Sequence, residues 1–260
     1  MCTSAANVAA VSMQAYEKMI SVDTNNLANS KTRGFKESHL MMKDIGWHNE
    51  KGSNSFNDNM TSRVIQYGMG TVGASSIMLM KQGQLENSAS PYDMAINGEG
   101  YFQIQMDDGT IAYTKDGTFD LDSDRRLCTT EGKPLLPEII IPQEANQFIV
   151  KSNGEVFVTI DGQTEQQNLG QIQIAVFQSP NGLRQIGDNL LIATSASGDA
   201  VLGYPEDAGF GKLRQYFYEA SNADPLRNLM HINECSKTYT HLTKVIQHCN
   251  QMAQAVNDRV

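Results

Sequence analysis

The C-terminal segment, residues 225–260, carries the pattern that most constrains the fold. Small and apolar side chains recur there at alternating steps of four and three: Cys235, Tyr239, Leu242, Ile246, Cys249, Ala253 and Val256. This spacing places them on one stripe of an α-helix, and the repeat is typical of a seam between packed helices. Asp224-Pro225 indicates where the helix begins, because proline is favoured at the first helical position. The predicted helix, 225–258, would be roughly 50 Å long and stable only with its stripe covered.

The N-terminal residues supply a partner for that stripe. Residues 4–29 read as a second helix, with one narrow stripe formed by Val8, Val11, Ala15, Met19, Val22 and Asn26. Its alanines allow a second helix to approach closely. We therefore expect the two terminal helices to pair as a coiled-coil-like bundle. Because both stripes are narrow, neighbouring copies of the chain would cover what remains.

The middle of the chain changes to a β pattern. Residues 94–106 alternate apolar and polar positions around a Gly-Glu-Gly break, and Asp-Gly or Asn-Gly pairs recur further on, as at 116–117, 153–154 and 181–182. Such pairs favour tight turns between strands. The predicted fold class is α+β, with an all-β central domain inserted between long terminal helices. The predicted domains are a terminal helical assembly domain (1–36 and 225–260), a connector (37–66) and a β-rich body (67–224).

The connector is predicted as a loop because residues 46–65 are rich in Asn, Ser and Gly. It contains Trp47, the only tryptophan of the chain. An aromatic ring in a polar connector is either a docking contact or a local cap on the core.

Composition excludes several classes of function. The 260 residues contain 29 acidic and 20 basic side chains, a net charge of −9, which argues against a duplex-binding surface. Eighteen consecutive apolar residues occur nowhere, so we expect no membrane-spanning helix and no direct membrane insertion. The N-terminus lacks the basic and apolar regions of a cleaved signal peptide. The four cysteines have neither metal-finger spacing nor the density of a disulfide scaffold.

The stretch NNLANSKTRGFK, residues 25–36, predicts a fixed corner where the first helix ends. Asparagine side chains there can hydrogen-bond free backbone carbonyls, and Gly34 can adopt a positive φ that other residues resist. We expect this corner to hold the N-terminal helix at a set angle to the β domain.

Candidate chemistry is weak. Asp120, Asp122, Asp124 and Glu131 follow calcium-loop spacing, but Arg125 stands where the loop needs glycine, so a solvated hairpin turn is favoured. His231 and Cys235 lie four apart on one helix, which offers two metal ligands and not a closed set, so we interpret them as surface and seam residues. Gly98 and Gly100 lack the rest of a nucleotide-binding loop. We predict no catalytic, cofactor-binding or metal-binding residues and no enzymatic activity.

The corner sequence closely resembles the N-terminal signature of bacterial flagellar rod and hook proteins. Residues 83–104 and 113–122 resemble two further motifs of that family, with Lys115 in place of an arginine, and residues 66–72, 182–203 and 209–222 are similar to the members that build the distal part of the rod. The resemblance covers nearly the whole chain in the same order. The positions that match the corner signature are Asn26, Leu27, Ala28, Asn29, Thr32, Gly34, Phe35 and Lys36.

The resemblance implies a structural, self-assembling protein without cofactors. Such subunits are exported without cleavage through the flagellar export apparatus. They polymerise into a hollow helical rod in the periplasm-spanning basal body and transmit torque to the hook through the outer-membrane and peptidoglycan ring bushing. The implied partners are other copies, other rod subunits, the hook protein, the bushing and the export apparatus. The expected assembly residues are Asn26, Leu27, Asn29, Thr32, Gly34 and Phe35 of the corner, and Val8, Ala15, Met19, Val22, Tyr239, Leu242, Ile246, Cys249 and Val256 of the seams.

Two alternatives remain open. Within the family, the chain is a proximal-rod or hook-type subunit; outside it, a monomeric β-domain cell-wall hydrolase with its helical ends serving as a clamp. The C-terminal helix departs from the family pattern at residues 226–228 and 237–240 and through His231, His241 and His248. These departures fall where subunits would pack.

Overall fold

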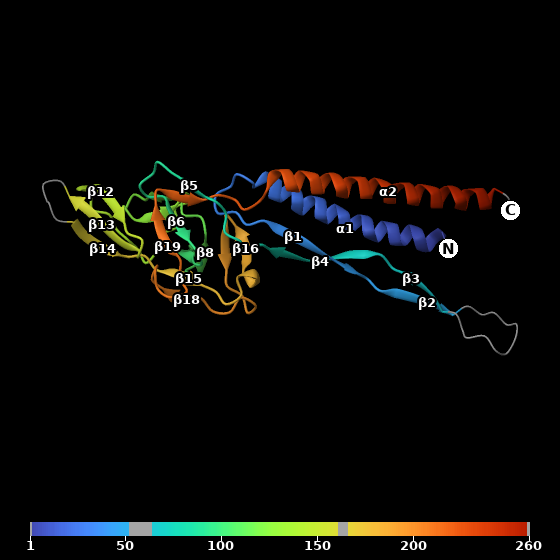
Figure 1. Cartoon of the computed structure of the whole chain (residues 1–260), viewed down its shortest axis with the longest axis horizontal. Coiled ribbons are helices and arrows are strands. Elements are labelled where there is room, and N and C mark those ends of the chain that lie inside the picture. Colours follow the sequence, from blue (N-terminus) through green and yellow to red (C-terminus); the bar gives the residue numbers. More distant parts are fainter. Residues whose placement is uncertain (1, 52–63, 161–165, 259–260) are drawn as a thin grey trace. The chain divides into compact units, whose positions relative to one another are not determined.

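The computed structural model of the chain describes residues 2–51, 64–160 and 166–258, which form two compact units (Figure 1). The helical unit contains residues 1–28, 38–78 and 224–260, and the body contains residues 29–37 and 79–223. The predicted order of an N-terminal helix, a β-rich middle and a C-terminal helix is confirmed.

In the helical unit, α1 (Cys2–Ala28) packs along α2 (Pro225–Asn257). Both helices begin and end within two residues of the predicted limits. Asp224 is the N-cap of α2: its carboxylate Oδ1 accepts hydrogen bonds from the backbone N–H groups of Leu226 (2.9 Å) and Arg227 (3.3 Å). Pro225 follows as the first helical residue, where its missing N–H costs nothing. Neither helix, within the residues described, has a stretch apolar enough to cross a membrane.

The predicted connector is a β-ribbon, so the loop expected for 37–66 is wrong over its described residues; positions 52–63 lie outside them. Antiparallel pairs join β1 (Ser38–Asp44) to β4 (Thr71–Met78) and β2 (Trp47–Lys51) to β3 (Val64–Gly68). β1 and β4 contact α1, and the Thr71 N–H donates to Ser12 Oγ at 3.4 Å. The ribbon therefore belongs to the helical unit, as do residues 67–78, which were expected in the β body.

Trp47 begins β2 and is 64% exposed, opposite Gly68 of β3. The interpretation of this ring as a cap on the core is therefore wrong. Its role as a docking contact stays a prediction.

The body consists of sixteen short strands and one 3-10 turn, η1 (Pro180–Gly182), over its described residues. The strands are β5 (Leu85–Asn87), β6 (Met94–Asn97), β7 (Tyr101–Gln105), β8 (Ile111–Thr114), β9 (Phe119–Leu121), β10 (Leu127–Thr129), β11 (Leu135–Leu136), β12 (Ala145–Val150), β13 (Glu155–Ile160), β14 (Gln166–Gln171), β15 (Ile174–Val176), β16 (Arg184–Gly187), β17 (Leu190–Ile192), β18 (Val201–Gly203), β19 (Lys212–Gln215) and β20 (Phe217–Glu219).

All strand pairs of the body are antiparallel. The largest sheet has the order β16-β17-β8-β7-β15-β18, with β11 also paired to β7, and β12-β13-β14 form a separate meander. The core centres on β6 and β7, where Phe102 stands edge-on to Phe119 with ring centroids 5.2 Å apart. Because every strand is short, the body depends on this shared core for its stability.

Candidate functional site

The corner predicted between residues 25 and 36 is divided between the two units. Asn26 lies near the end of α1, in the helical unit, and is fully buried. Its amide Nδ2 donates to the carbonyl of Ser38 (2.7 Å), and its Oδ1 accepts from the N–H of the same residue (3.0 Å). The side chain thus pairs with the start of β1 as a neighbouring strand would. We had expected it to bond free carbonyls at the helix end instead.

The rest of the corner is built into the body. Gly34 has φ +68°, the positive value predicted, and its N–H donates to the carbonyl of Glu219 at 2.8 Å. A Cβ at this position would lie 2.7 Å from the backbone nitrogen of Asp116. Only glycine therefore fits, for two independent reasons.

The remaining corner residues support this turn. Thr32 Oγ1 donates to Asn29 Oδ1 (3.1 Å), and the Thr32 N–H donates to the Asn29 carbonyl (3.1 Å). Phe35 is buried, whereas Leu27, in α1, is half-buried. The corner is thus a hydrogen-bonded turn with one aromatic anchor.

A buried charge cluster lies directly behind the turn, and sequence reasoning missed it. The carboxylate of Glu219 is fully buried and accepts hydrogen bonds from Lys36 Nζ and from the N–H of Gly83 (2.8 Å). Lys115 Nζ lies 3.9 Å from its second oxygen and donates to the carbonyl of Gly98 (2.8 Å). We call Lys36, Lys115 and Glu219 the charge triad. Two ammonium groups share one carboxylate, all within the body.

Burial shifts the pKa values of groups in and beside the charge triad. Burial lowers the pKa of the Lys115 ammonium to about 8; the Glu219 charge opposes this shift and the Lys36 charge reinforces it. Burial, with the charges of Glu219 and Glu99, raises the pKa of the neighbouring Tyr101 phenol. Lys115 and Tyr101 also line a cavity of about 280 Å³. A perturbed lysine in a cavity is a functional-site signal, but here the structural triad accounts for it.

The seam residues divide between covered and uncovered positions. Ala15 and Cys249 are buried, but Val256 is 63% exposed. Tyr239 Oη donates to Glu17 Oε1 of α1 at 3.0 Å. The half-buried members are Val8, Met19, Val22, Tyr239, Leu242 and Ile246. Sequence reasoning missed four buried positions that are small or polar and therefore weaken the hydrophobic pattern: Ala9, Ser12, Asp23 and Asn228.

The calcium-like spacing forms the hairpin turn that was favoured. β9 and β10 pair around it, and the Arg125 N–H donates to the Asp122 carbonyl at 2.8 Å. The Arg126 guanidinium lies 3.3 Å from Asp122 Oδ2 and 3.4 Å from Asp124 Oδ2. These carboxylates therefore have an internal cation, which weakens any claim to a calcium site.

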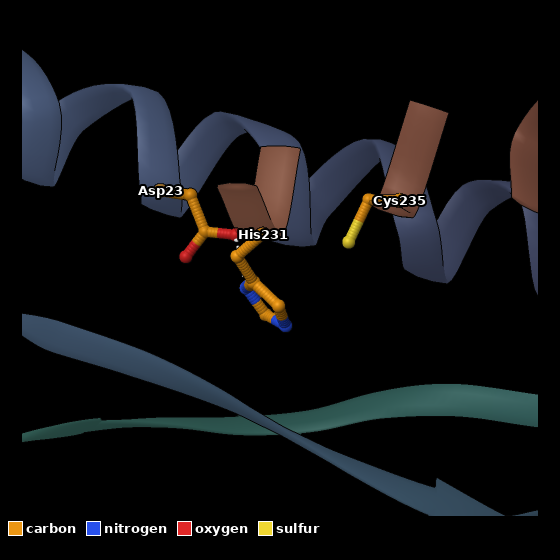
Figure 2. Close-up of side chains that lie close together, drawn as sticks. All are labelled: Asp23, His231 and Cys235. Atoms are coloured by element: carbon orange, nitrogen blue, oxygen red, sulfur yellow. Dashed lines mark hydrogen bonds and ion pairs between the residues drawn. The ribbon is translucent and has the colours of Figure 1, made fainter. Parts of the chain in front are cut away.

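One group in the helical unit has the donor set of a metal site. Asp23 of α1 meets His231 of α2, with 2.7 Å between Asp23 Oδ2 and His231 Nδ1, and Cys235 follows one turn later (Figure 2). Asp23 was not singled out from the sequence, because a lone carboxylate in a helix carries no local signal.

Known proteins resemble this chain over nearly its whole length. A family model described as the flagellar hook protein FlgE/F/G D1 domain matches residues 95–158, which include the core strands of the body. The flagellar basal-body rod protein FlgG of Caulobacter vibrioides is 37% identical over 256 residues, covering 97% of this chain and 98% of that protein. FlgG of Buchnera aphidicola subsp. Schizaphis graminum is 36% identical, covering 94% and 95%. FlgF of C. vibrioides is also a basal-body rod protein but is only 25% identical, covering 93% and 91%.

Proposed function

This chain belongs to the FlgG family of flagellar basal-body rod proteins, and we infer that it is a structural subunit of the distal rod. The observation that carries this is identity of 37% over 97% of the chain, against 25% to an FlgF rod protein of the same organism. The comparison therefore favours the distal-rod interpretation over the proximal one. The protein's location is the flagellar basal body.

We propose that the chain polymerises through its terminal helices into a hollow helical shaft that transmits torque to the hook. Support comes from the surface of α2. One stripe of that helix is partly covered by α1, but several large apolar side chains of the helix, Val256 of the stripe among them, are exposed: Leu226, Leu229, Met230, Val245, Met252 and Val256. Exposed large apolar side chains gathered on one helix favour an interaction site, and further copies of the chain are the proposed occupant.

The lengths of the helices point the same way. α2 has 33 residues and α1 has 27, so α2 is about 9 Å longer at 1.5 Å per residue. The described residues of α2 beyond Cys249 are all exposed. A helical end that cannot bury its apolar side chains within one chain gains stability when a neighbour covers it.

We propose the remaining partners from family membership: other rod subunits, the hook protein, the ring bushing and the export apparatus. The corner residues Asn26, Leu27, Asn29, Thr32, Gly34 and Phe35 are proposed as assembly residues, because their hydrogen bonds restrain the chain where it passes between the two units. No enzymatic role is proposed, and a peptidoglycan zymogram of the purified chain should show no clearing, against the hydrolase alternative.

The test of the assembly proposal is electron microscopy of the concentrated full-length chain beside two variants. Leu229→Glu combined with Met252→Glu places charges on the exposed apolar surface of α2, while Ser236→Glu changes an exposed polar position on the same helix. We expect tubes or straight fibres from the parent and from Ser236→Glu, and none from the double variant. Fibres from all three proteins would show that α2 is not the assembly surface. A parent that stays monomeric even when seeded with rod fragments would overturn the proposal.

A further inference from the structure

Three side chains of different chemistry meet where α1 packs on α2. Asp23 projects from α1, and His231 and Cys235 project from successive turns of α2, all to the same side of the helix pair (Figure 2). Asp23 is 2% exposed and Cys235 is 3% exposed, whereas the His231 side chain is 43% exposed. Two ligand types are therefore held by packing, and the third faces an opening.

The spacing of the donor atoms suits a metal ion. One carboxylate oxygen, one imidazole nitrogen and the thiol sulfur all lie within 4.8 Å of one another. Zinc bonds of 2.0–2.3 Å in a tetrahedral site place neighbouring donors roughly 3.3–3.6 Å apart. The 2.7 Å hydrogen bond between Asp23 and His231 would open slightly, and the sulfur would move inward. Rotations of the three side chains are the movement that the site requires.

The identity of the donors selects the class of metal. Thiolate and imidazole suit borderline transition metals such as zinc, whereas magnesium and calcium prefer oxygen donors alone. Three protein ligands leave a fourth position for water or an incoming group. His231 lines a depression of about 370 Å³ whose other lining residues are His39, Arg227, Asn228, Met230 and Glu234, so that fourth position has space and mostly polar surroundings.

We propose that Asp23, His231 and Cys235 form a binding site for one zinc-class divalent cation that cross-links α1 to α2. The ion would join residues more than two hundred positions apart in the sequence and fasten the two terminal helices together. Metal binding at such a site is coupled to folding, because the ligands come together only when the helices pair. The inference does not depend on polymerisation of the chain.

A simpler interpretation accounts for part of the geometry. Asp23 and His231 already form a hydrogen-bonded pair, and Cys235 Sγ already donates to Met19 Sδ at 3.3 Å. In that case the three side chains are ordinary helix-packing contacts. The two interpretations differ in the role of Cys235. In the packing interpretation its sulfur stays on Met19, whereas in the metal site its sulfur bonds to the ion.

The experiment is cobalt(II) spectroscopy with zinc competition, on the full-length chain purified without a histidine tag and treated with a chelator. Cobalt bound by a thiolate gives a near-ultraviolet charge-transfer band that reports the Co–S bond directly. We expect this band to saturate at one cobalt per chain and to disappear on addition of zinc. We also expect the midpoint of helix unfolding, followed by circular dichroism, to rise with zinc.

The variants assign the band to the site. Cys235→Ser should abolish it, and Asp23→Asn, which conserves side-chain shape, should weaken cobalt binding by more than about 100-fold, since even outer-shell changes cost 10–100-fold. Cys249→Ser, a change of another buried cysteine of α2, and Cys128→Ser, in the body, are the matched controls and should leave the band unchanged. Circular dichroism of each variant verifies that the helices are formed. Absence of the band in the parent, or the same band in Cys235→Ser, would refute the site.

Discussion

The charge triad makes a prediction that can be worked through from its contacts. Replacing Glu219 with glutamine keeps the shape of the side chain and an oxygen that accepts from the Gly83 N–H. It removes the negative charge that faces Lys36 and Lys115, both nearly fully buried. The substitution therefore leaves two buried ammonium groups without a counter-ion from this position.

The expected cost follows from the balance between burial and pairing. Removing one partner of a buried ion pair costs about 3–5 kcal/mol, because the remaining charge stays desolvated. Lys115 can relieve part of this by losing its proton, since burial already brings its pKa to about 8. At pH 7 we therefore expect Glu219→Gln to lower the free energy of unfolding of the body by about 3–4 kcal/mol.

The assay is urea unfolding of the full chain, followed by near-ultraviolet circular dichroism of the aromatic side chains, most of which lie in the body. Glu206→Gln is the matched control, because Glu206 pairs with Lys212 at 3.3 Å on the exposed surface, where water screens the pair, so the substitution should change stability little. A Glu219→Gln variant as stable as this control would refute the argument.

A second variant separates charge from packing. Replacing the charge triad with Lys36→Met, Lys115→Met and Glu219→Leu removes every buried charge of the cluster together. Apolar replacements of whole buried ion clusters are often neutral or stabilising. We expect the triple variant to recover most of the stability lost in Glu219→Gln. Additive losses from the three changes would instead show that the cluster's hydrogen bonds to the backbone dominate.

Three further predictions concern single positions. Gly34→Ala should destabilise the body by more than the roughly 1–2 kcal/mol that a left-handed conformation costs, because the added Cβ also meets the backbone of Asp116. Gly109→Ala is its control in the same urea assay: Gly109 has φ +79° with open space around it, so this variant should show the conformational cost alone. The folded-state pKa of Lys115 lies below its ordinary 10.5, so the cost of burying the charged ammonium is fully present below pH 8 and fades as pH rises to 10.5. Across that window the free energy of unfolding of the parent should rise by up to about 3 kcal/mol relative to Lys115→Met. Urea unfolding at a series of pH values measures this. Asp224→Ala should cost about 0.5–2 kcal/mol through loss of the N-cap of α2, and Asp224→Asn should cost much less, as followed by far-ultraviolet circular dichroism during thermal unfolding.

The terminal helices could be predicted because their signals are local. Cys235 and Cys249, which the spacing places on one stripe, are buried in the structure, and Asp224-Pro225 marks the first turn of α2. Val256 continues the same spacing but is exposed, because one chain does not supply enough surface to cover it. A periodic pattern therefore predicts which side chains need to be covered, and a single chain covers only part of this one.

The ribbon β1–β4 could not be predicted in the same way. In β1 and β4 almost every side chain is half-buried or exposed, so neither strand has a buried face that would require the alternation of apolar and polar residues on which strand prediction depends. The polar composition of residues 46–65 then resembled a loop. Pairing between the strands, not burial, defines this element.

The charge triad, and the part that Asp23 plays beside His231 and Cys235, were missed for a different reason. Each group consists of residues that are ordinary in their local sequence and meaningful only together. Lys36 and Glu219 are 183 positions apart, and Asp23 and His231 are 208 apart. A lysine or aspartate in isolation reads as solvent-exposed, because most are. Only the three-dimensional pairing reveals that Lys36, Glu219 and Asp23 are buried.

Asn26 shows how one corner residue can be tested without disturbing the rest. Its amide donates to the carbonyl of the half-buried Ser38 and accepts from the Ser38 N–H, while Asn26 itself is fully buried in the helical unit. Asn26→Asp keeps the size of the side chain but replaces the donor with a second acceptor, which then faces the Ser38 carbonyl. Losing this hydrogen bond costs about 0.5–1.5 kcal/mol, and a carboxylate at the fully buried position of Asn26 adds to that. We therefore expect a loss of at least 2 kcal/mol at pH 7, smaller at pH 4 because a protonated aspartate can donate again. Asn233→Asp, at an exposed position of α2, is the control for adding a charge to the helix pair. Thermal unfolding, followed by far-ultraviolet circular dichroism, measures the stability of both variants. If Asn26→Asp were as stable as Asn233→Asp at both pH values, the hydrogen bonds between Asn26 and Ser38 would contribute nothing to holding β1 against α1.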